Sequence, residues 1–157
     1  MSELEQLKAL WHSSPEQRAK IVDDAAASAD IETLKWLWNE SHNPKFRTKL
    51  MDGVAARANS EELRWFWTES HNPEHRIKVM EGVSARADSE TLKWFWNESF
   101  DNEHRMMILE GVTARADFDT LKWFWQKSYS PEFKDIVLKA MQIKEKDMLS
   151  RKADQSQ

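Results

Sequence analysis

Two histidines, His71 and His75, stand four residues apart in the sequence. That spacing can place two side chains on one face of a helix, where imidazole nitrogens could hold a metal ion. This pair, however, straddles an expected helix start, and the chain repeats the surrounding segment with other residues in its place. The equivalent positions hold His42 with Phe46 and Phe100 with His104. Because the neighbouring repeats do not keep the pair, we expect no metal site.

Catalytic patterns are missing elsewhere in the chain as well. The sequence has no glycine-rich phosphate loop, no Gly-x-Ser-x-Gly and no His-Glu-x-x-His. It also has no cysteine, which excludes disulfides, thiolate zinc sites, iron–sulfur clusters and cysteine nucleophiles. We therefore expect a non-enzymatic protein with no catalytic residues, no metal and no cofactor.

The nine tryptophans are the residues that could do chemistry of another kind, because an indole face can stack on a proline ring, a cation or a base. Eight of them form two rows in which neighbours are 29 residues apart. The first row is Trp36, Trp65, Trp94 and Trp123, and the second is Trp38, Trp67, Trp96 and Trp125.

The same interval of 29 separates the three glycines, Gly53, Gly82 and Gly111. Residues 59–87 and 88–116 are identical at 17 of 29 positions, and the N-terminal segment fits as a divergent first repeat. We expect one helical-repeat domain over residues 1–150. Its five repeats cover about 1–29, 30–58, 59–87, 88–116 and 117–150, and residues 151–157 are expected to form a frayed tail.

Each repeat carries two helix start signals. Asp30 and its equivalents can cap a first helix, here called helix A, and Asn43-Pro44 and similar pairs can start a second, helix B. Paired helices of constant length predict an all-α fold, a right-handed αα-solenoid of five hairpins with an architecture of the HEAT and tetratricopeptide type. The period of 29 is shorter than in those repeats.

The glycines lie about ten residues into helix B, where each could end the helix or permit a close contact. The end repeats have Asp24 and Ala140 at this position, within helix-favouring runs. We therefore expect helix B to continue through the glycine and another helix to approach it.

Helical periodicity separates the two tryptophan rows. Leu34, Leu37 and Trp38 fall on one core stripe of helix A, so we expect the second tryptophan row, Trp38, Trp67, Trp96 and Trp125, to be buried. Trp36 lies about 150° away from this stripe, on the side of Glu40. Trp36 and its equivalents either fill a second contact between helices or form an exposed ladder that binds a ligand. In helix B, Arg47 falls within the apolar face, so we expect its stem to pack and its head to reach Glu40 or the last carbonyls of helix A. Arg18, Arg76, Arg105 and Lys134 occupy the equivalent positions.

The ladder interpretation predicts a protein- or peptide-interaction scaffold. Tryptophans on neighbouring A helices would be about 8–10 Å apart, the usual spacing of packed helices. This distance matches the length of about three residues of polyproline II. The expected partner is a protein or an extended peptide, with proline-rich and basic segments as candidates. The expected binding residues are the first tryptophan row and its acidic neighbours: Trp36, Trp65, Trp94, Trp123, Glu40, Glu69 and Glu98.

Two alternatives remain open at this stage. One is a homodimer in which the ladder is buried in the interface. The other is single-stranded nucleic acid or DNA binding, which ranks lower because the glutamate row would repel phosphates and the formal net charge is −4. The N-terminus lacks the pattern of a signal peptide and no stretch approaches 18 apolar residues, so we expect a cytoplasmic protein that does not enter a membrane.

Overall fold

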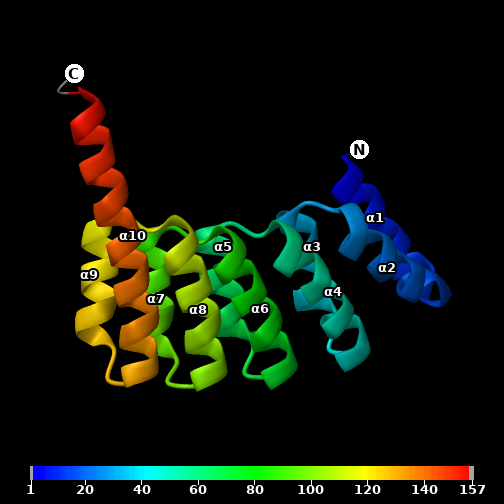
Figure 1. Cartoon of the computed structure of the whole chain (residues 1–157). Helices are drawn as coiled ribbons and strands as arrows, with labels where there is room; N and C mark the ends of the chain where they lie inside the picture. Colours follow the sequence, from blue (N-terminus) through cyan, green and yellow to red (C-terminus); the bar gives the residue numbers. More distant parts are fainter. Residues whose placement is uncertain (1, 156–157) are drawn as a thin grey trace. The chain divides into compact units, whose positions relative to one another are not determined.

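The computed structural model describes residues 2–155 and is helical throughout, without a strand among those residues (Figure 1). Each helix packs against helices that are close to it in the sequence. The chain falls into two compact units, Met1–Gly82 and Val83–Gln157, with the boundary inside one helix. Each unit contains complete helical hairpins, and the single domain predicted from the sequence stays a prediction.

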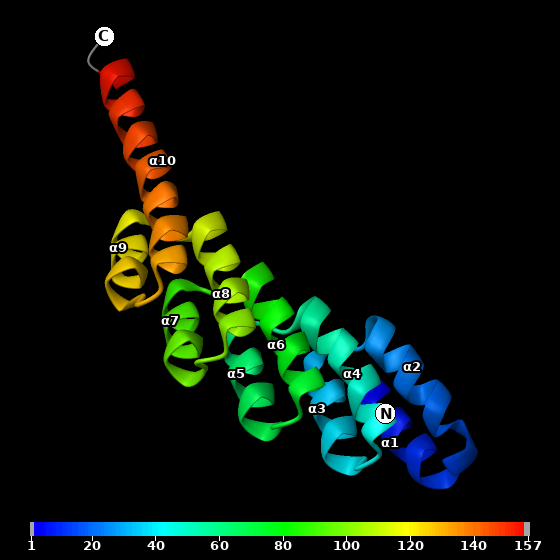
Figure 2. The same cartoon turned by 60° about the horizontal axis from the view of Figure 1, so that its bottom comes forward.

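Within the described residues, ten α-helices alternate between the A and B positions of the repeat (Figure 2). The A helices are α1 (Glu3–Ser13), α3 (Ile31–Glu40), α5 (Ser60–Glu69), α7 (Ser89–Glu98) and α9 (Phe118–Lys127). The B helices are α2 (Arg18–Ser28), α4 (Pro44–Arg57), α6 (Pro73–Arg86), α8 (Asn102–Arg115) and α10 (Pro131–Gln155).

The predicted helix starts are confirmed. The side chain of Asp30 accepts a hydrogen bond from the amide of Thr33, which holds the pKa of Asp30 below its ordinary value. Asn43 caps α4 ahead of Pro44 in the same way. The first repeat differs, because Pro15 starts a short 3-10 turn, η1 (Pro15–Gln17), before α2.

Arg47 joins the two helices of its repeat. Its Nε donates to the carbonyl of Ser41 at 2.8 Å and its Nη2 donates to the carbonyl of Trp38 at 2.9 Å. The guanidinium carbon lies 4.4 Å from the ring centre of Trp38, so the cation also stacks on the indole. Of the two predicted targets, the arginine head thus reaches the last carbonyls of the A helix. Arg76 and Arg105 make the same bonds in their repeats.

The glycines lie inside helices with negative φ, which confirms that helix B continues through them. A Cβ atom on Gly53 would come within 2.9 Å of Leu34 Cδ1 and 3.0 Å of the carbonyl oxygen of Ala26 in α2. A Cβ on Gly111 would meet the carbonyl oxygen of Ser84 at 3.0 Å. At both places the missing side chain lets one B helix approach the end of the preceding one.

The core confirms the predicted stripe of helix A, with one correction. Trp38, Trp67 and Trp96 are buried, but Trp125 is 38% exposed. Trp96 packs edge-on against Phe124 and Phe133, which belong to the next repeat. Trp125 has no following hairpin to cover it in the described chain, so the expectation that the whole second row is buried was wrong at this position.

The last helix is much longer than the others. It starts at Pro131 and continues beyond α9 to Gln155, as Figures 1 and 2 both show. Every side chain from Gln142 to Gln155 is exposed. The structure thus keeps residues 151–155 of the predicted frayed tail in helix, and residues 156–157 lie outside the described part.

Candidate functional site

The first tryptophan row lies on the A helices, and each member precedes the second-row tryptophan of its repeat by two positions in the sequence. All four side chains are half-buried: Trp36, Trp65, Trp94 and Trp123. Trp36 packs edge-on against Trp11 and His12 of α1, with ring centres 6.3 Å and 5.9 Å apart. The row is therefore neither fully buried nor fully exposed: its indoles contact neighbouring side chains and keep part of their surface in solvent.

A lysine from the preceding A helix covers part of these rings. Lys35 Nζ lies 5.0 Å from the ring centre of Trp65, and Lys93 Nζ lies 5.5 Å from that of Trp123. Lys8 takes the same place over Trp36 at 5.6 Å. Such cation–π contacts leave a ligand only the remaining face and edge of each indole.

Exposed polar side chains lie one turn further along α3, α5 and α7. The acidic residues expected at the site are there: Glu40, Glu69 and Glu98. The residue before each of them is also exposed: Asn39, Thr68 and Asn97. On a helix, positions three and four residues after a tryptophan share its face. Trp36, Trp65 and Trp94 thus share a helix face with the predicted glutamate of their own repeat, and the role of these residues in binding stays a prediction.

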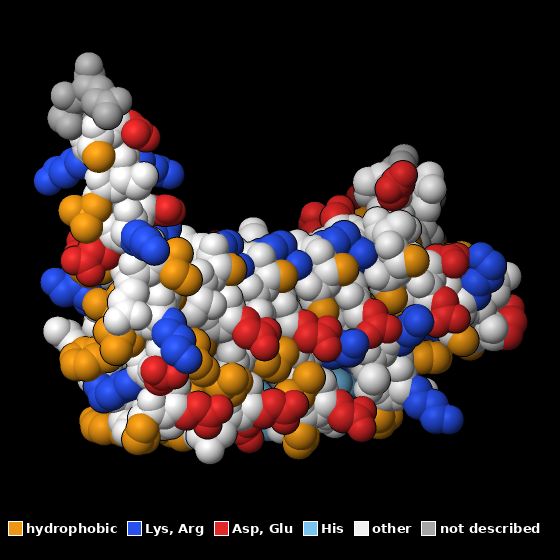
Figure 3. Space-filling model, in the orientation of Figure 1, with side chains coloured by type: hydrophobic (Ala, Val, Ile, Leu, Met, Phe, Trp, Pro, Cys, Tyr) orange, Lys and Arg blue, Asp and Glu red, His pale blue; other side chains and the backbone are white. Residues whose placement is uncertain are grey.

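The solvent-facing side of the B helices carries charged side chains (Figure 3) and no tryptophan of either row. In Figure 3, acidic side chains gather over α4 and α6 in the first unit and over α8 in the second. In the first unit these charges include an ion-pair network, in which Lys78 Nζ lies 3.3 Å from Asp52 and 3.6 Å from Glu81. No tryptophan of either row belongs to a B helix, so an aromatic ligand-binding surface built from these rows can form only on the A helices.

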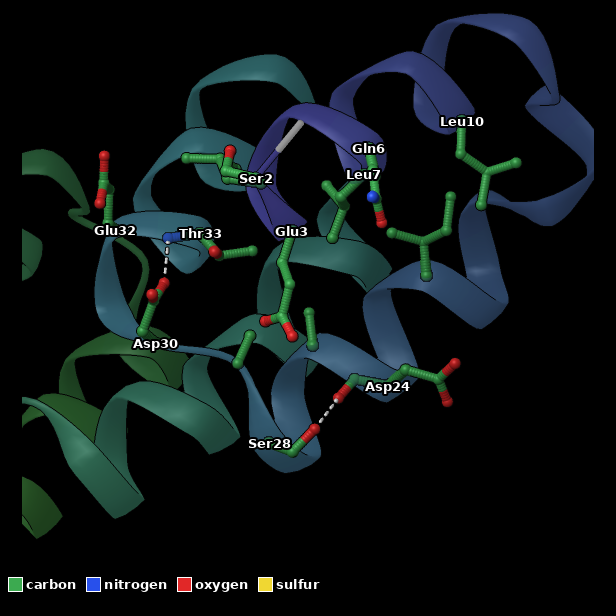
Figure 4. Close-up of a pocket in the computed structure, with 14 residues that line it drawn as sticks. Ser2, Glu3, Gln6, Leu7, Leu10, Asp24, Ser28, Asp30, Glu32 and Thr33 are labelled. Carbon is green, nitrogen blue, oxygen red and sulfur yellow. Dashed lines mark hydrogen bonds between the residues drawn. The ribbon is translucent and has the colours of Figure 1, made fainter.

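A hollow of about 970 Å³ lies in the first unit between α1, α2 and the start of α3. Figure 4 shows Leu7 and Leu10 on one wall and Asp24 and Ser28 on another. Asp24 occupies the position that Gly53 holds in the second repeat, where α2 packs against α4. The hollow therefore lies on the side of the first hairpin that corresponds, in later repeats, to the side on which the preceding B helix packs.

His75, in α6, is a buried titratable side chain that is 5% exposed. Its Nδ1 lies 2.8 Å from Ser70 Oγ and its Nε2 lies 3.2 Å from Thr48 Oγ1. Burial, followed by the charge of Arg47, lowers the pKa of His75 below its ordinary value of 6.5. The imidazole is thus a neutral core group that bridges two repeats, as its ring contact with Trp38 also indicates.

Sequence reasoning missed a second set of arginines, at the ends of the B helices. Arg57 donates to the carbonyls of Ala25, Ala26, Ala27 and Ala29 at the end of α2. Arg115 donates to carbonyls at the end of α6 in the same way. The signal was present, because Arg57, Arg86 and Arg115 are 29 residues apart. Arg57 and Arg115 each cap orphan carbonyls and so fix one hairpin on another.

Within residues 2–155, no group of three or more acidic or histidine side chains is arranged to hold a metal ion. No helix in this part of the chain is long and apolar enough to cross a bilayer. Comparison with protein-family models, curated proteins and solved structures gives no match for this chain. The class that the fold defines is an all-helical, tryptophan-rich protein whose helices pack on their neighbours in the sequence.

Proposed function

We propose that the chain is a solenoid of five helical hairpins that serves as a scaffold for binding a protein or an extended peptide. The binding surface is the outer face of the A helices, where the half-buried tryptophans alternate with exposed amide and acidic side chains. The observation that carries the proposal is that all four tryptophans of the first row keep solvent contact while Trp38, Trp67 and Trp96 are buried.

The solenoid is supported by interfaces that recur in both units. In the first unit, Trp38 meets Phe66 edge-on with ring centres 5.8 Å apart, and in the second unit Trp96 meets Phe124 at 5.4 Å. The arginine caps recur in the same way at Arg57 and Arg115. A chain that repeats one interface stacks its repeats in one direction.

A proline-rich segment fits this surface better than a basic one. The chain's own lysines already lie over part of the rings of Trp65 and Trp123, so a ligand cation would compete with them. Proline rings need only an apolar face, and a polyproline II segment advances about 9 Å in three residues, close to the spacing of packed helices. The exposed amide of Asn97 can donate to and accept from the bare peptide groups of such a segment.

Tryptophan fluorescence tests the proposal with a ten-residue polyproline peptide as the probe. We expect saturable binding by the full chain and at least a tenfold weaker affinity for the double variant Trp65→Ala/Trp94→Ala. Trp125→Ala is the matched control, because Trp125 is exposed but belongs to the second row. Equal binding by both variants, or no binding by the native chain, would contradict the proposal that the first tryptophan row binds an extended peptide.

Single-stranded nucleic acid is a second candidate, favoured by one observation. Lys8, Lys35 and Lys93 alternate with tryptophans along the A helices, and basic side chains interleaved with aromatic ones can follow a stacked strand. Titration with a ten-residue oligothymidylate at two salt concentrations separates the candidates. Nucleic acid binding should weaken steeply with salt, whereas polyproline binding should not.

A further inference from the structure

The part of α10 beyond the last repeat has no buried side chain. Residues 142–155 are all exposed, and Figures 1 and 2 show this end of the helix standing clear of α9. An isolated helix of this length is only marginally stable in water. Its exposed apolar side chains, Met148 and Leu149 among them, are therefore available to a partner molecule.

One face of the projecting helix has a pattern that is complementary to itself. At 100° per residue, Glu145, Met148, Leu149 and Lys152 fall within about 100° of one another. Met148 is 55% and Leu149 is 62% exposed, so two large apolar side chains occupy the middle of this face. The acidic residue stands on one side of them and the basic residue on the other, each three residues away.

The two charges have no opposite charge nearby on their own helix. On a helix surface the neighbours of a residue are three and four positions away. For Glu145 these are Met141, Gln142, Met148 and Leu149, and for Lys152 they include Met148, Leu149 and Gln155, all neutral. An opposite charge for either residue must come from outside the helix.

We infer that the projecting half of α10 pairs with the same segment of a second molecule, antiparallel and about a two-fold axis between Met148 and Leu149. In this arrangement Met148 of each molecule lies against Leu149 of the other. Glu145 then faces Lys152 of the second molecule, and the symmetry makes this ion pair twice. An isologous interface requires such reciprocal contacts.

The rest of the projecting helix carries further exposed apolar side chains, such as Ile143, which is 67% exposed. Figure 3 shows hydrophobic side chains interspersed with charged ones along the exposed part of α10. This surface belongs to a B helix and shares no residue with the tryptophan row on the A helices.

Charge reversal tests the pairing with the full chain. Sedimentation velocity should show a concentration-dependent dimer for the native protein. Glu145→Lys and Lys152→Glu each convert both ion pairs into like-charge pairs, so each variant should dimerise about tenfold more weakly. A one-to-one mixture of the two variants should regain native affinity, because the lysine introduced in one variant then faces the glutamate introduced in the other.

Asp147→Lys is the matched control, since it changes the net charge as Glu145→Lys does but lies about 150° away from the centre of the paired face. It should dimerise like the native chain. A native chain that stays monomeric at several hundred micromolar, a mixture that fails to recover, or equal effects of Asp147→Lys and Glu145→Lys would overturn the inference. The double reversal Glu145→Lys/Lys152→Glu should dimerise alone, which excludes misfolding as the cause of the single-variant losses.

Discussion

The role of His75 can be assigned only from its surroundings in the structure. Its spacing from His71 suggested metal chemistry, but the side chain lies in the core and bonds to Ser70 and Thr48. Every B helix from α4 to α10 has a ring at the position equivalent to His75: Phe46, His75, His104 and Phe133. His75 therefore occupies a packing position that two other repeats fill with phenylalanine. Its ring nitrogens form hydrogen bonds with neighbours within the fold.

We expect the stability of the protein to fall as the pH drops below 6.5, partly because of His75. Its pKa is lowered in the folded state, so the unfolded chain binds this proton more readily. The contribution is fully present above the ordinary pKa of 6.5 and is lost as pH falls toward the folded-state pKa. His75→Phe should reduce the difference in unfolding free energy between pH 7.5 and pH 5.5, measured by urea denaturation.

The equivalent Phe46 and Phe133 show that phenylalanine fits this position in other repeats. Loss of the two hydrogen bonds of His75 should cost about 1 kcal/mol at pH 7.5. His12→Phe is the control for replacing a histidine by phenylalanine at an exposed position. An unaltered pH slope in His75→Phe would show that His75 is not the group responsible.

Replacing Gly53 even with alanine should destabilise the protein. Alanine favours a helix by about 1 kcal/mol over glycine, but the added Cβ would lie 2.9 Å from Leu34 Cδ1 and 3.0 Å from the Ala26 carbonyl oxygen. Neither neighbour can retreat easily, since Leu34 is fully buried and Ala26 offers its backbone. We expect Gly53→Ala to lower the unfolding free energy, measured by urea denaturation, by about 1–2 kcal/mol.

A double-mutant cycle with Arg57 identifies the cause. The added Cβ would also lie 2.8 Å from Arg57 Nη2, which is held by carbonyls of α2. Gly53→Ala should therefore cost less in an Arg57→Ala background than in the native one. A stabilising Gly53→Ala, or strictly additive effects, would mean that α2 and α4 are not in this close contact.

At the scale of the helix, packing of the next hairpin decides how much a tryptophan of the second row contributes to stability. Trp96→Ala should lower the unfolding free energy by about 3–5 kcal/mol, because its indole is buried against Phe124 and Phe133. Trp125→Ala removes the same residue type from the same repeat position, but its side chain is 38% exposed. We expect a loss of about 1 kcal/mol there, measured by chemical denaturation. Equal losses would imply that another surface covers Trp125.

The sequence predicted the helices well because their signals are local. Asp30 and Asn43 lie where a helix start needs a hydrogen-bond acceptor, and Gly53 could be placed inside a helix by comparison with Asp24 and Ala140. Solvent exposure was harder to predict, because it depends on which helix comes next. Trp125 has nearly the same sequence context as Trp96 but lacks a following hairpin in the described chain. The half-buried state of Trp36 likewise depends on α1, whose sequence diverges from the other A helices.

The caps made by Arg57 and Arg115 were missed for a related reason. Periodicity marks these residues, but a basic side chain at a helix end is equally typical of a solvated terminus. Their carbonyl partners belong to a helix about 30 residues earlier in the sequence. Only the packing of one B helix on another reveals that the arginines are part of the interface between repeats.

At the scale of the whole molecule, stability should be a sum of hairpin terms and interface terms, and a complete repeat should be removable. Deleting residues 59–87 joins Ala58 to Asp88, which caps α7 as Asn59 caps α5. Trp38, which now packs on Phe66 and His75, would meet the equivalent Phe95 and His104. Arg115 would find the backbone carbonyls of Val54, Ala55 and Ala58 in place of those of Val83, Ser84 and Ala87.

We therefore expect the shortened chain to fold, with native helicity per residue by circular dichroism and one cooperative transition at a lower denaturant concentration. The control is deletion of residues 59–85, which falls two residues short of the period. That change inserts Arg86 and Ala87 between α4 and the cap of α7, so every later side chain is displaced from its partner in the preceding repeat. A solenoid should tolerate the first deletion and not the second. If both shortened chains unfold, the repeats do not stack through interchangeable interfaces, and the two compact units owe their stability to contacts specific to each.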